Sequence, residues 1–250
     1  MKFKDQLIEG TLVKRYKRFF AEIKLLSGEL VTAHTANTGP MTTCFEIGRP
    51  ALLSRHDNPK RKLKYSLEMI KAPQSWIGVN THLANQLTSE AIQNKTIQEL
   101  QGYKNIFPEY KIGNSRLDFM LTNSNSPECF VEVKSVTLLG DNNQALFPDA
   151  VTTRGQKHLL ELMDLKKKGF RTVMLFIVQR EDVTQFKIAA HIDKNYAKLL
   201  TQALHFEVEI LVYGCRLTAQ EIIIDKKLLY APQLNSTETL DEVTPSQVAL

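Results

Sequence analysis

The chain has 250 residues, of which 43% are hydrophobic and 24% charged, a composition typical of globular proteins and unlike that of disordered or collagen-like chains. The sequence contains neither a run of about 18 apolar residues, as a membrane span requires, nor the apolar core of a signal peptide, so we expect a cytoplasmic protein without a membrane partner. The three cysteines are far apart and lack metal-ligand spacing, which argues against a disulfide framework and against a structural zinc site.

Positive charge is concentrated in the first quarter of the chain. Residues 1–72 hold 14 Lys and Arg against 7 Asp and Glu, whereas the whole chain has a net charge of +5, so the remainder is slightly acidic. A basic segment beside a near-neutral one favours a phosphate-bearing partner such as DNA, with RNA as the alternative nucleic acid. A solvated surface without a partner is the competing interpretation.

Residues 1–72 are predicted to form short β-strands. The candidate strands cover residues 19–26, 29–33, 51–54 and 63–70. So many short strands in so few residues indicate a small barrel or sandwich. Between them lie the candidate nucleic-acid contacts, which are Lys14, Arg15, Tyr16, Lys17, Arg18, Lys60, Arg61 and Lys62. Cations hold phosphates while aromatic rings stack on bases, although lysine-decorated edge strands give the same pattern.

The segment Lys71-Ala-Pro73-Gln-Ser75 is a predicted domain junction, and residues 76–230 then change to a mixed α/β pattern. Helices are expected at about 80–93, 153–168 and 193–206, and strands are expected near Tyr110 and at 116–121, 129–136, 171–178 and 207–213. This alternation predicts a mixed sheet with helices on its faces. Residues 231–250 are rich in Ser, Thr and Glu and are expected to form a disordered tail.

Two apolar strands carry charged residues in their interior. Asp118 lies in the predicted strand at 116–121, and Glu132 and Lys134 lie in the following strand. Residues two apart in a strand share a face, so Glu132 and Lys134 are expected to project together while Val133 faces the core. If the two strands pair with each other, Asp118 approaches Glu132.

Two neighbouring carboxylates repel each other unless a cation lies between them. Mg²⁺ or Mn²⁺ is the expected cofactor, because both ions prefer oxygen ligands. The predicted metal ligands are Asp118, Glu132 and the carbonyl of Val133, which together would form a phosphodiester-hydrolysing site. In that site Lys134 would orient a water or stabilise the charge of the transition state, and Glu90 would be an accessory acid. A structural salt bridge at a strand end is the alternative.

A second set of polar residues lies at the start of the helix predicted at 153–168. Free backbone N–H groups at a helix start bind phosphate, and cations placed there oppose the helix dipole, which favours a functional role. The nucleic-acid contacts predicted from this set are Arg154, Gln156, Lys157 and His158. Arg116, two residues before Asp118, is a further predicted contact. His158 is also a candidate general acid, although a lone histidine is more often a surface or core residue.

Several ordered motifs of this sequence are similar to those of one known family. They are Arg15-Tyr-Lys-Arg-Phe19, Asn37-Thr-Gly39 with Met41, Asp57-Asn-Pro-Lys-Arg-Lys62, Asn114-Ser-Arg-Leu-Asp-Phe119, Glu132-Val-Lys-Ser-Val-Thr-Leu138 and Phe147-Pro-Asp-Ala-Val-Thr152 followed by Arg154-Gly-Gln-Lys-His-Leu159. Over residues 3 to about 225, the chain therefore resembles the bacterial and archaeal sugar fermentation stimulation (SfsA) family.

The resemblance implies an N-terminal OB-fold, here residues 1–72, joined to a C-terminal domain of the PD-(D/E)XK nuclease type, here residues 76–230. It also implies DNA binding without strong sequence preference and a role in regulating sugar (maltose) metabolism. Asp118, Glu132 and Lys134 map onto the D…ExK motif of that nuclease type.

The sequence leaves three functions open. The first is a DNA-binding protein with an active metal-dependent nuclease site, and the second is a DNA-binding module whose acidic site is vestigial. The third is a transcriptional regulator that reads operators, for which no helix-turn-helix pattern is present. The complete set of Asp118, Glu132 and Lys134 favours the first, and the oligomeric state stays open.

Overall fold

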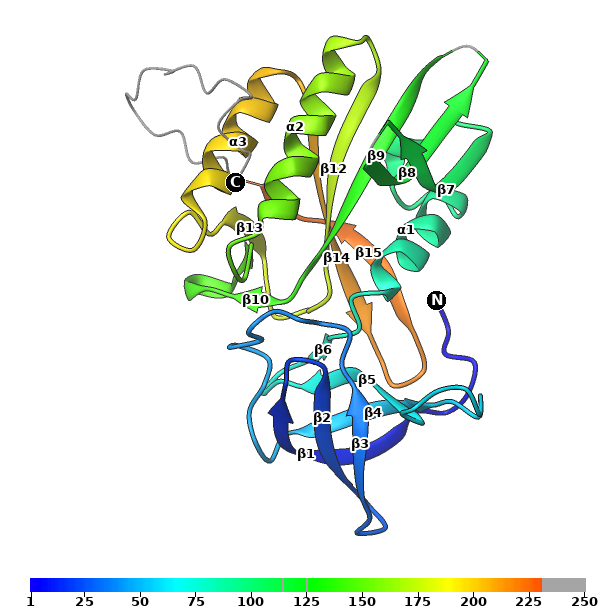
Figure 1. The fold of residues 1–250 in the computed structure, drawn as a ribbon, viewed down its shortest axis with the longest axis vertical. Coiled ribbons are helices and arrows are strands. Elements are labelled where there is room, and N and C mark those ends of the chain that lie inside the picture. The colour runs from blue at the N-terminus through cyan, green and yellow to red at the C-terminus, as the bar shows by residue number, and fades with distance from the viewer. Residues whose placement is uncertain (114, 125, 231–250) are drawn as a thin grey trace.

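The computed structural model describes residues 1–113, 115–124 and 126–230, so the predicted tail at 231–250 lies outside the described residues. Two units stand one above the other in Figure 1: a β-barrel formed by the N-terminal part of the chain and a larger unit in which helices flank a sheet. Within the described ranges, no helix combines the length and the apolar character that crossing a membrane requires.

The N-terminal unit is a closed five-stranded barrel. Its strands are β1 (Ile8–Tyr16), β2 (Phe20–Leu25), β3 (Leu30–His34), β4 (Pro50–Arg55) and β5 (Tyr65–Lys71). Neighbouring strands pair antiparallel in the order β3-β2-β1-β4-β5, and a parallel pairing of β3 with β5 closes the ring. Leu12, Ile23 and Leu67 are among the side chains that fill the interior. The predicted small barrel is confirmed.

The structure corrects the prediction at the first strand. The sequence pattern places Lys14, Arg15 and Tyr16 between strands, whereas they form the end of β1, where charged side chains interrupt the apolar alternation. The turn to β2 begins with Lys17 and Arg18, whose φ angles are 49° and 61°. These two residues are exposed, so the turn presents cations to solvent at one end of the barrel.

The C-terminal unit is built on a six-stranded mixed sheet. In spatial order its strands are β15 (Ile222–Lys227), β14 (Glu209–Leu217), β12 (Arg171–Val178), β9 (Ser126–Val136), β8 (Ser115–Asn123) and β7 (Asn105–Ile112). The three central strands β14, β12 and β9 are parallel, and the outer strands pair antiparallel. Strand β12 is buried along nearly its whole length, as a parallel strand covered on both faces should be.

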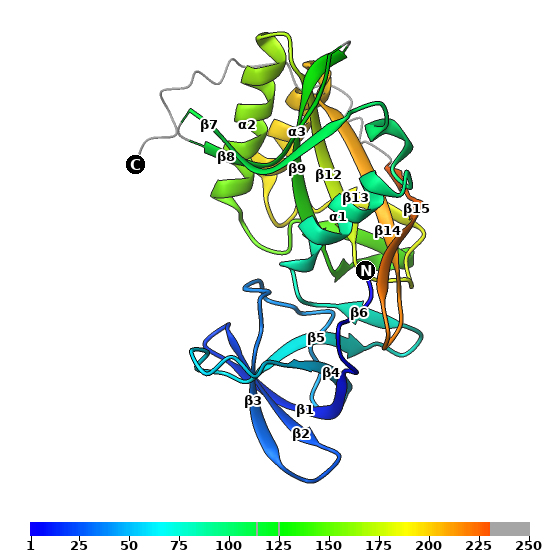
Figure 2. The ribbon, with the colours of Figure 1, turned by 90° about the vertical axis from the view of Figure 1, so that its right-hand side faces the viewer.

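Helices cover both faces of this sheet, as the sequence predicts (Figures 1 and 2). They are α1 (Leu83–Gln93), α2 (Thr153–Lys167) and α3 (Lys194–His205). On one face, Leu87 of α1 belongs to the same apolar cluster as Val131 of β9. On the other face, Leu162 of α2 belongs to a cluster with Phe176 of β12. Strand β9 is therefore enclosed between α1 and α2.

Short elements complete the second unit and join it to the barrel. Strand β6 (Trp76–Gly78) pairs antiparallel with β5 and extends the barrel sheet toward the second unit. The second unit also contains a small sheet of β10 (Leu138–Leu139), β11 (Gln144–Phe147), β13 (Gln185–Ile188) and β16 (Leu229–Tyr230), and the 3₁₀ turns η1 (Gln98–Leu100) and η2 (Asp141–Asn143). The backbone N–H of Gly78 donates to the carbonyl of Gln179 at 2.9 Å, just beyond the end of β12. The sequence does not predict these elements, because two to four residues carry too little periodicity.

Candidate functional site

Asp118 lies where strands β8 and β9 separate. Their antiparallel ladder ends at the pair formed by Phe119 and Val131. Asp118 is the adjacent residue of β8, and its Oδ2 accepts a hydrogen bond from the backbone N–H of Val133 at 2.7 Å. A carboxylate therefore binds the backbone of β9 at the point where the ladder ends.

The other oxygen of Asp118 is held by helix α1. Oδ1 accepts a hydrogen bond from Nδ2 of Asn85 at 2.7 Å. Burial raises the pKa of Asp118, and the nearby charge of Glu132 raises it further, against the opposing effect of these hydrogen bonds. Sequence reasoning does not identify Asn85, because an asparagine inside an amphipathic helix gives no distinctive signal.

Glu132 lies on β9 and points toward helix α2. Only 3% of its side chain is exposed, and Oε1 accepts a hydrogen bond from Nζ of Lys134 at 2.5 Å and contacts Nδ1 of His158. Burial acts to raise the pKa of Glu132, but the hydrogen bonds and charges of His158 and Lys134 outweigh burial and lower the pKa. The structure thus brings Glu132 and Lys134 together on one face of β9.

The ring of His158 connects Glu132 to helix α2. Its Nδ1 contacts Oε1 of Glu132, and its Nε2 lies 3.5 Å from Nε of Arg154, a nitrogen that can only donate. Nζ of Lys134 lies 3.0 Å from the same Nδ1, so Glu132, Lys134 and Arg154 all meet this ring. His158 is buried and belongs to the wall around Glu132.

The start of α2 is fixed by hydrogen bonds rather than left open. Thr152 caps the helix by accepting from the N–H of Gly155 at 3.0 Å. Gln156 donates to both oxygens of Asp193, the residue that caps α3. Of the residues predicted to contact nucleic acid here, Gln156 is thus engaged within the protein, whereas Arg154 and Lys157 are exposed.

The structure does not bring Glu90 to the acidic site. The amino group of Met1 lies 2.8 Å from one oxygen of Glu90, so this carboxylate pairs with the start of the chain. The residue of α1 that contacts Asp118 is Asn85, which lies three residues after the helix N-cap, His82. Within the part of the chain that the structure describes, no hydrogen bond or ion pair joins Glu90 to Asp118, Glu132 or Lys134, and its role as an accessory acid stays a prediction.

Of the remaining residues predicted to contact nucleic acid, Arg15 is held within the protein and most of the others are exposed cations. Arg15 donates to the carbonyls of Pro40, Arg18 and Asn37 and so shapes the loop after β3. Lys14 pairs with Glu22 at 3.1 Å on the barrel surface. The cations that lie exposed are Lys17, Arg18, Lys60, Arg61, Lys62 and Arg116, and Tyr16 is partly buried against Phe20.

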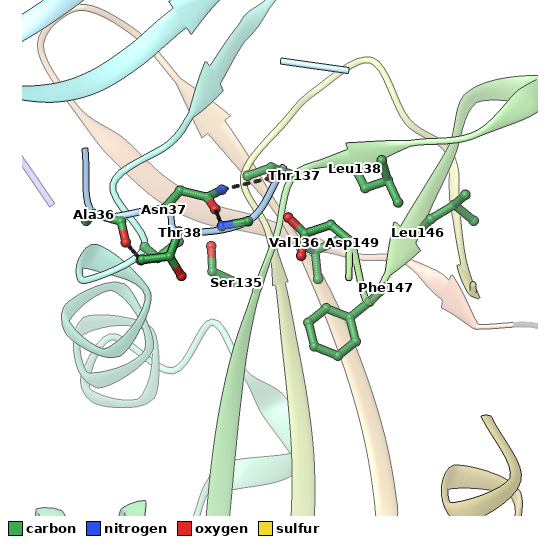
Figure 3. Close-up of a pocket in the computed structure, with 12 residues that line it drawn as sticks. Ala36, Asn37, Thr38, Ser135, Val136, Thr137, Leu138, Leu146, Phe147 and Asp149 are labelled. Atoms are coloured by element: carbon green, nitrogen blue, oxygen red, sulfur yellow. Dashed lines mark hydrogen bonds between the residues drawn. The ribbon is translucent and has the colours of Figure 1, made fainter. Parts of the chain in front are cut away.

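A cavity lies at the seam between the two units (Figure 3). Its volume is about 160 Å³, and its lining joins the loop at Ala36–Gly39 of the barrel to Ser135–Leu138 at the end of β9. Asn37 donates to the hydroxyl of Thr137 at 3.4 Å across the seam. Burial raises the pKa of Asp149, which also lines the cavity. Ser135 follows Lys134 in the chain, so the end of β9 contributes residues to both the acidic site and this cavity.

The donor atoms around Asp118 suit a hard cation. Oε2 of Glu132 is buried and has no hydrogen-bond partner among the described residues. Across residues 1–113, 115–124 and 126–230, no group of three or more His, Cys, Asp or Glu side chains is arranged to hold a metal ion. A metal site here would therefore depend on two carboxylates and a backbone oxygen. Such oxygen donors fit Mg²⁺ and Mn²⁺ better than softer metals.

Comparisons with known proteins match both units. A model of the SfsA N-terminal OB domain matches residues 13–79, and a model of the sugar fermentation stimulation protein RE domain matches residues 82–221. A sugar fermentation stimulation protein homolog from Pseudoalteromonas atlantica is 49% identical over 231 residues, covering 91% of this chain and 98% of that protein. A homolog from Geotalea uraniireducens is 51% identical over 223 residues, covering 89% of this chain and 96% of the relative.

Among solved structures, that of Pyrococcus furiosus SfsA in complex with Ca²⁺ matches with a TM-score of 0.83 at 29% identity. The match covers 91% of this chain and 96% of that chain. These agreements confirm the expected combination of an OB-fold with a C-terminal mixed α/β domain.

Proposed function

The chain belongs to the sugar fermentation stimulation protein family, and on that basis we propose that it is a DNA-binding protein with a metal-dependent nuclease-type site formed by Asp118, Glu132 and Lys134. We propose a cytoplasmic protein whose DNA binding ignores sequence and which acts in the regulation of sugar (maltose) metabolism. Mg²⁺ or Mn²⁺ is the proposed cofactor, and the Ca²⁺ named for the Pyrococcus furiosus relative supports a divalent ion.

One observation carries the proposal. Asp118 of β8 is bound to the backbone of Val133, the residue that stands between Glu132 and Lys134 on β9. The N–H and C=O of one strand residue point to the same neighbouring strand, so the carbonyl of Val133 faces the Asp118 side too. This supports the predicted ligand set of Asp118, Glu132 and the Val133 carbonyl.

The chemistry assigned to these residues follows from their charges. A bound Mg²⁺ or Mn²⁺ ion would polarise the phosphodiester and lower the pKa of an attacking water. Asp118 and Glu132 would hold the ion, and His158 holds Glu132 by its hydrogen bond. Lys134, 14% exposed beside Glu132, would stabilise the negative charge that grows on the phosphate oxygens in the transition state.

Exposed cations on both units are proposed to hold the DNA backbone. Lys17 and Arg18 lie at the turn after β1, and Arg154 and Lys157 lie at the start of α2. Such contacts neutralise phosphates without reading bases, so the binding should weaken steeply with salt and depend little on sequence. DNA is proposed as the nucleic acid because the charge pattern and the fold favour it.

The enclosure of Glu132 favours a second candidate function. Its side chain is only 3% exposed and is already bound by Lys134 and His158. A buried carboxylate whose Oε1 is held by two side chains of the same unit is expected in a DNA-binding module whose acidic site has a structural role. Metal binding or cleavage measured directly separates this candidate from the nuclease.

The test is incubation with single-stranded and double-stranded DNA in the presence of Mg²⁺ or Mn²⁺, with Asp118→Ala beside the unmodified chain. Cleavage that requires the metal and disappears in Asp118→Ala supports the nuclease. The matched control is Glu128→Gln, because Glu128 is an exposed acid on the same strand as Glu132. Tight DNA binding without cleavage by either protein supports the non-catalytic module.

A further inference from the structure

Three barrel strands align polar side chains at one rim of the barrel. The parallel pairing of β3 with β5 places His34 beside Ser66, and the antiparallel pairing of β5 with β4 places Ser66 beside Ser54. A cavity of about 170 Å³ opens at this rim and is also lined by His56 and His82. We call this cavity, defined by His34, His56, Arg61, Ser66, Glu68 and His82, the rim pocket.

A hydrogen-bond network orients the wall of the rim pocket. The hydroxyl of Ser54 donates to Oε1 of Glu68 at 2.6 Å, and Nδ2 of Asn80 donates to Oε2 at 2.8 Å. Nε2 of His56 lies 3.1 Å from Oγ of Ser54 and 2.9 Å from Oγ of Ser66, so the ring is held between two hydroxyl groups. Both oxygens of the buried Glu68 are therefore bound, and this carboxylate serves as the floor of the network rather than as an open acid.

Cationic and imidazole groups surround the opening. Nη2 of Arg61, from the exposed loop before β5, donates to Oγ of Ser66 at 3.1 Å. Burial lowers the pKa of His34, and the neighbouring His82 and Arg61 lower it further. Burial also lowers the pKa of His56, and Arg61 adds to that effect against the opposing charges of Glu68 and Asp57. Burial and the charge of Arg61 thus both disfavour protonation of these imidazoles, and a bound anion would offset that effect.

We infer that the rim pocket binds a phosphate group. Three imidazoles around one cavity supply N–H donors, and the guanidinium of Arg61 supplies the positive charge that a phosphate requires. The volume of about 170 Å³ lies below the roughly 300–1,000 Å³ of pockets that enclose drug-sized ligands, so the pocket fits a phosphate rather than a whole nucleotide.

The rim pocket lies close to the acidic site. His82 is the N-cap residue of α1, and Asn85, which binds Asp118, follows three residues later. Three residues of α-helix rise by about 4.5 Å, so α1 connects the two sites over a short distance. That the phosphate belongs to a nucleic acid rests on the proposed function, whereas the pocket's affinity for phosphate does not.

The experiment is an NMR titration of the six histidine side chains in the full chain with inorganic phosphate, at constant ionic strength. We expect the imidazole signals of His34, His56 and His82 to move and their pKa values to rise, while those of His191 and His205 stay unchanged. Arg61→Gln should weaken this binding about tenfold or more, because a charge-assisted contact is lost. Arg61 is exposed, so folding should be preserved.

Lys64→Gln is the matched control, because Lys64 is exposed in the same loop and does not line the rim pocket. If Lys64→Gln weakens binding as much as Arg61→Gln does, or if phosphate moves no imidazole of the pocket, the inference is overturned. The titration needs neither metal nor cleavage, so it stands even if the nuclease proposal fails.

Oligonucleotides with a 5′-phosphate or a 5′-hydroxyl identify the source of the phosphate. Shifts caused only by the phosphorylated strand assign a terminal phosphate, and equal shifts with both strands assign an internal phosphodiester. Shifts with inorganic phosphate but with neither strand support the phosphate pocket and overturn nucleic acid as its carrier.

Discussion

Asp118 accepts a hydrogen bond from the backbone N–H of Val133 at 2.7 Å, across the point where β8 and β9 separate. This bond fixes a carboxylate of one strand next to Glu132 of the other. The pKa of Asp118 is raised by burial and by Glu132, whereas Lys134 and His158 lower that of Glu132. Of the two acids, Asp118 is therefore the one whose charged form a bound cation would stabilise more.

Removing the charge of Asp118 should stabilise the metal-free protein. A carboxyl whose pKa is raised in the folded state costs stability once the pH exceeds its unfolded value, and the full cost is reached above the folded value. Asp118→Asn should thus raise Tm by a few degrees at neutral pH and have little effect in acid. Calorimetry across pH checks this, and a lower Tm at neutral pH would contradict it.

Removing His158 should loosen Glu132 and weaken metal binding. His158→Ala deletes the hydrogen bond to a carboxylate that is proposed to bind the ion, and loss of such a supporting partner reduces metal affinity about tenfold to a hundredfold. Calorimetric titration with Mn²⁺ measures the change at a temperature where the variant is folded. The control is His205→Ala at the exposed end of α3, and equal affinities in all three proteins would rule out this role.

Asp193 should stabilise the starts of both α2 and α3. Burial acts to raise its pKa, but hydrogen bonds from the N–H groups of Thr152 and Tyr196 and from Gln156 outweigh burial and lower it. Asp193→Ala should reduce the free energy of unfolding by about 2 kcal/mol at neutral pH.

The contribution of Asp193 to the free energy of unfolding depends on pH. A lowered pKa contributes stability above the unfolded value near 4, and that stability is lost as the pH falls through the folded value. The difference between Asp193→Ala and the unmodified chain, measured by urea unfolding, should therefore shrink below about pH 4. Asp164→Ala, at an exposed acid of α2, serves as the control, and a difference that grows in acid would refute the assignment.

DNA affinity should fall linearly with the logarithm of salt concentration. Arg154→Gln should reduce the magnitude of that slope by about 1, because one phosphate contact is removed. Lys198→Gln, which removes an exposed charge from α3, should leave the slope unchanged. Fluorescence anisotropy with two unrelated sequences provides the measurement, and identical slopes for all three proteins would remove Arg154 from the proposed interface.

Much of the fold follows from local patterns in the sequence. The long amphipathic helices and the apolar strand β12 carry a clear period or a continuous apolar run, and the structure confirms them. The end of β1 gives no such signal, because its last residues are charged. The closure of the barrel by β3 and β5 joins segments about 30 residues apart, which no local pattern specifies.

The acidic site is predictable because charge inside an apolar strand is costly. Glu132 and Lys134 share a face for the reason the strand period gives, and the structure bears this out. The contacts of Glu90 do not follow from the sequence pattern, because the neighbours of a helix residue depend on how the helix packs against the sheet. Here α1 turns Asn85 toward Asp118 and Glu90 toward the amino group of Met1.

Calorimetric titration with Mn²⁺ in the absence of DNA is the sharpest test of a metal site formed by Asp118 and Glu132. We expect one ion per chain in the unmodified protein and in Glu128→Gln, and loss of that ion in both Asp118→Asn and Glu132→Gln. An unmodified chain that binds no ion, or binding that survives in both site variants, would contradict a metal site between β8 and β9.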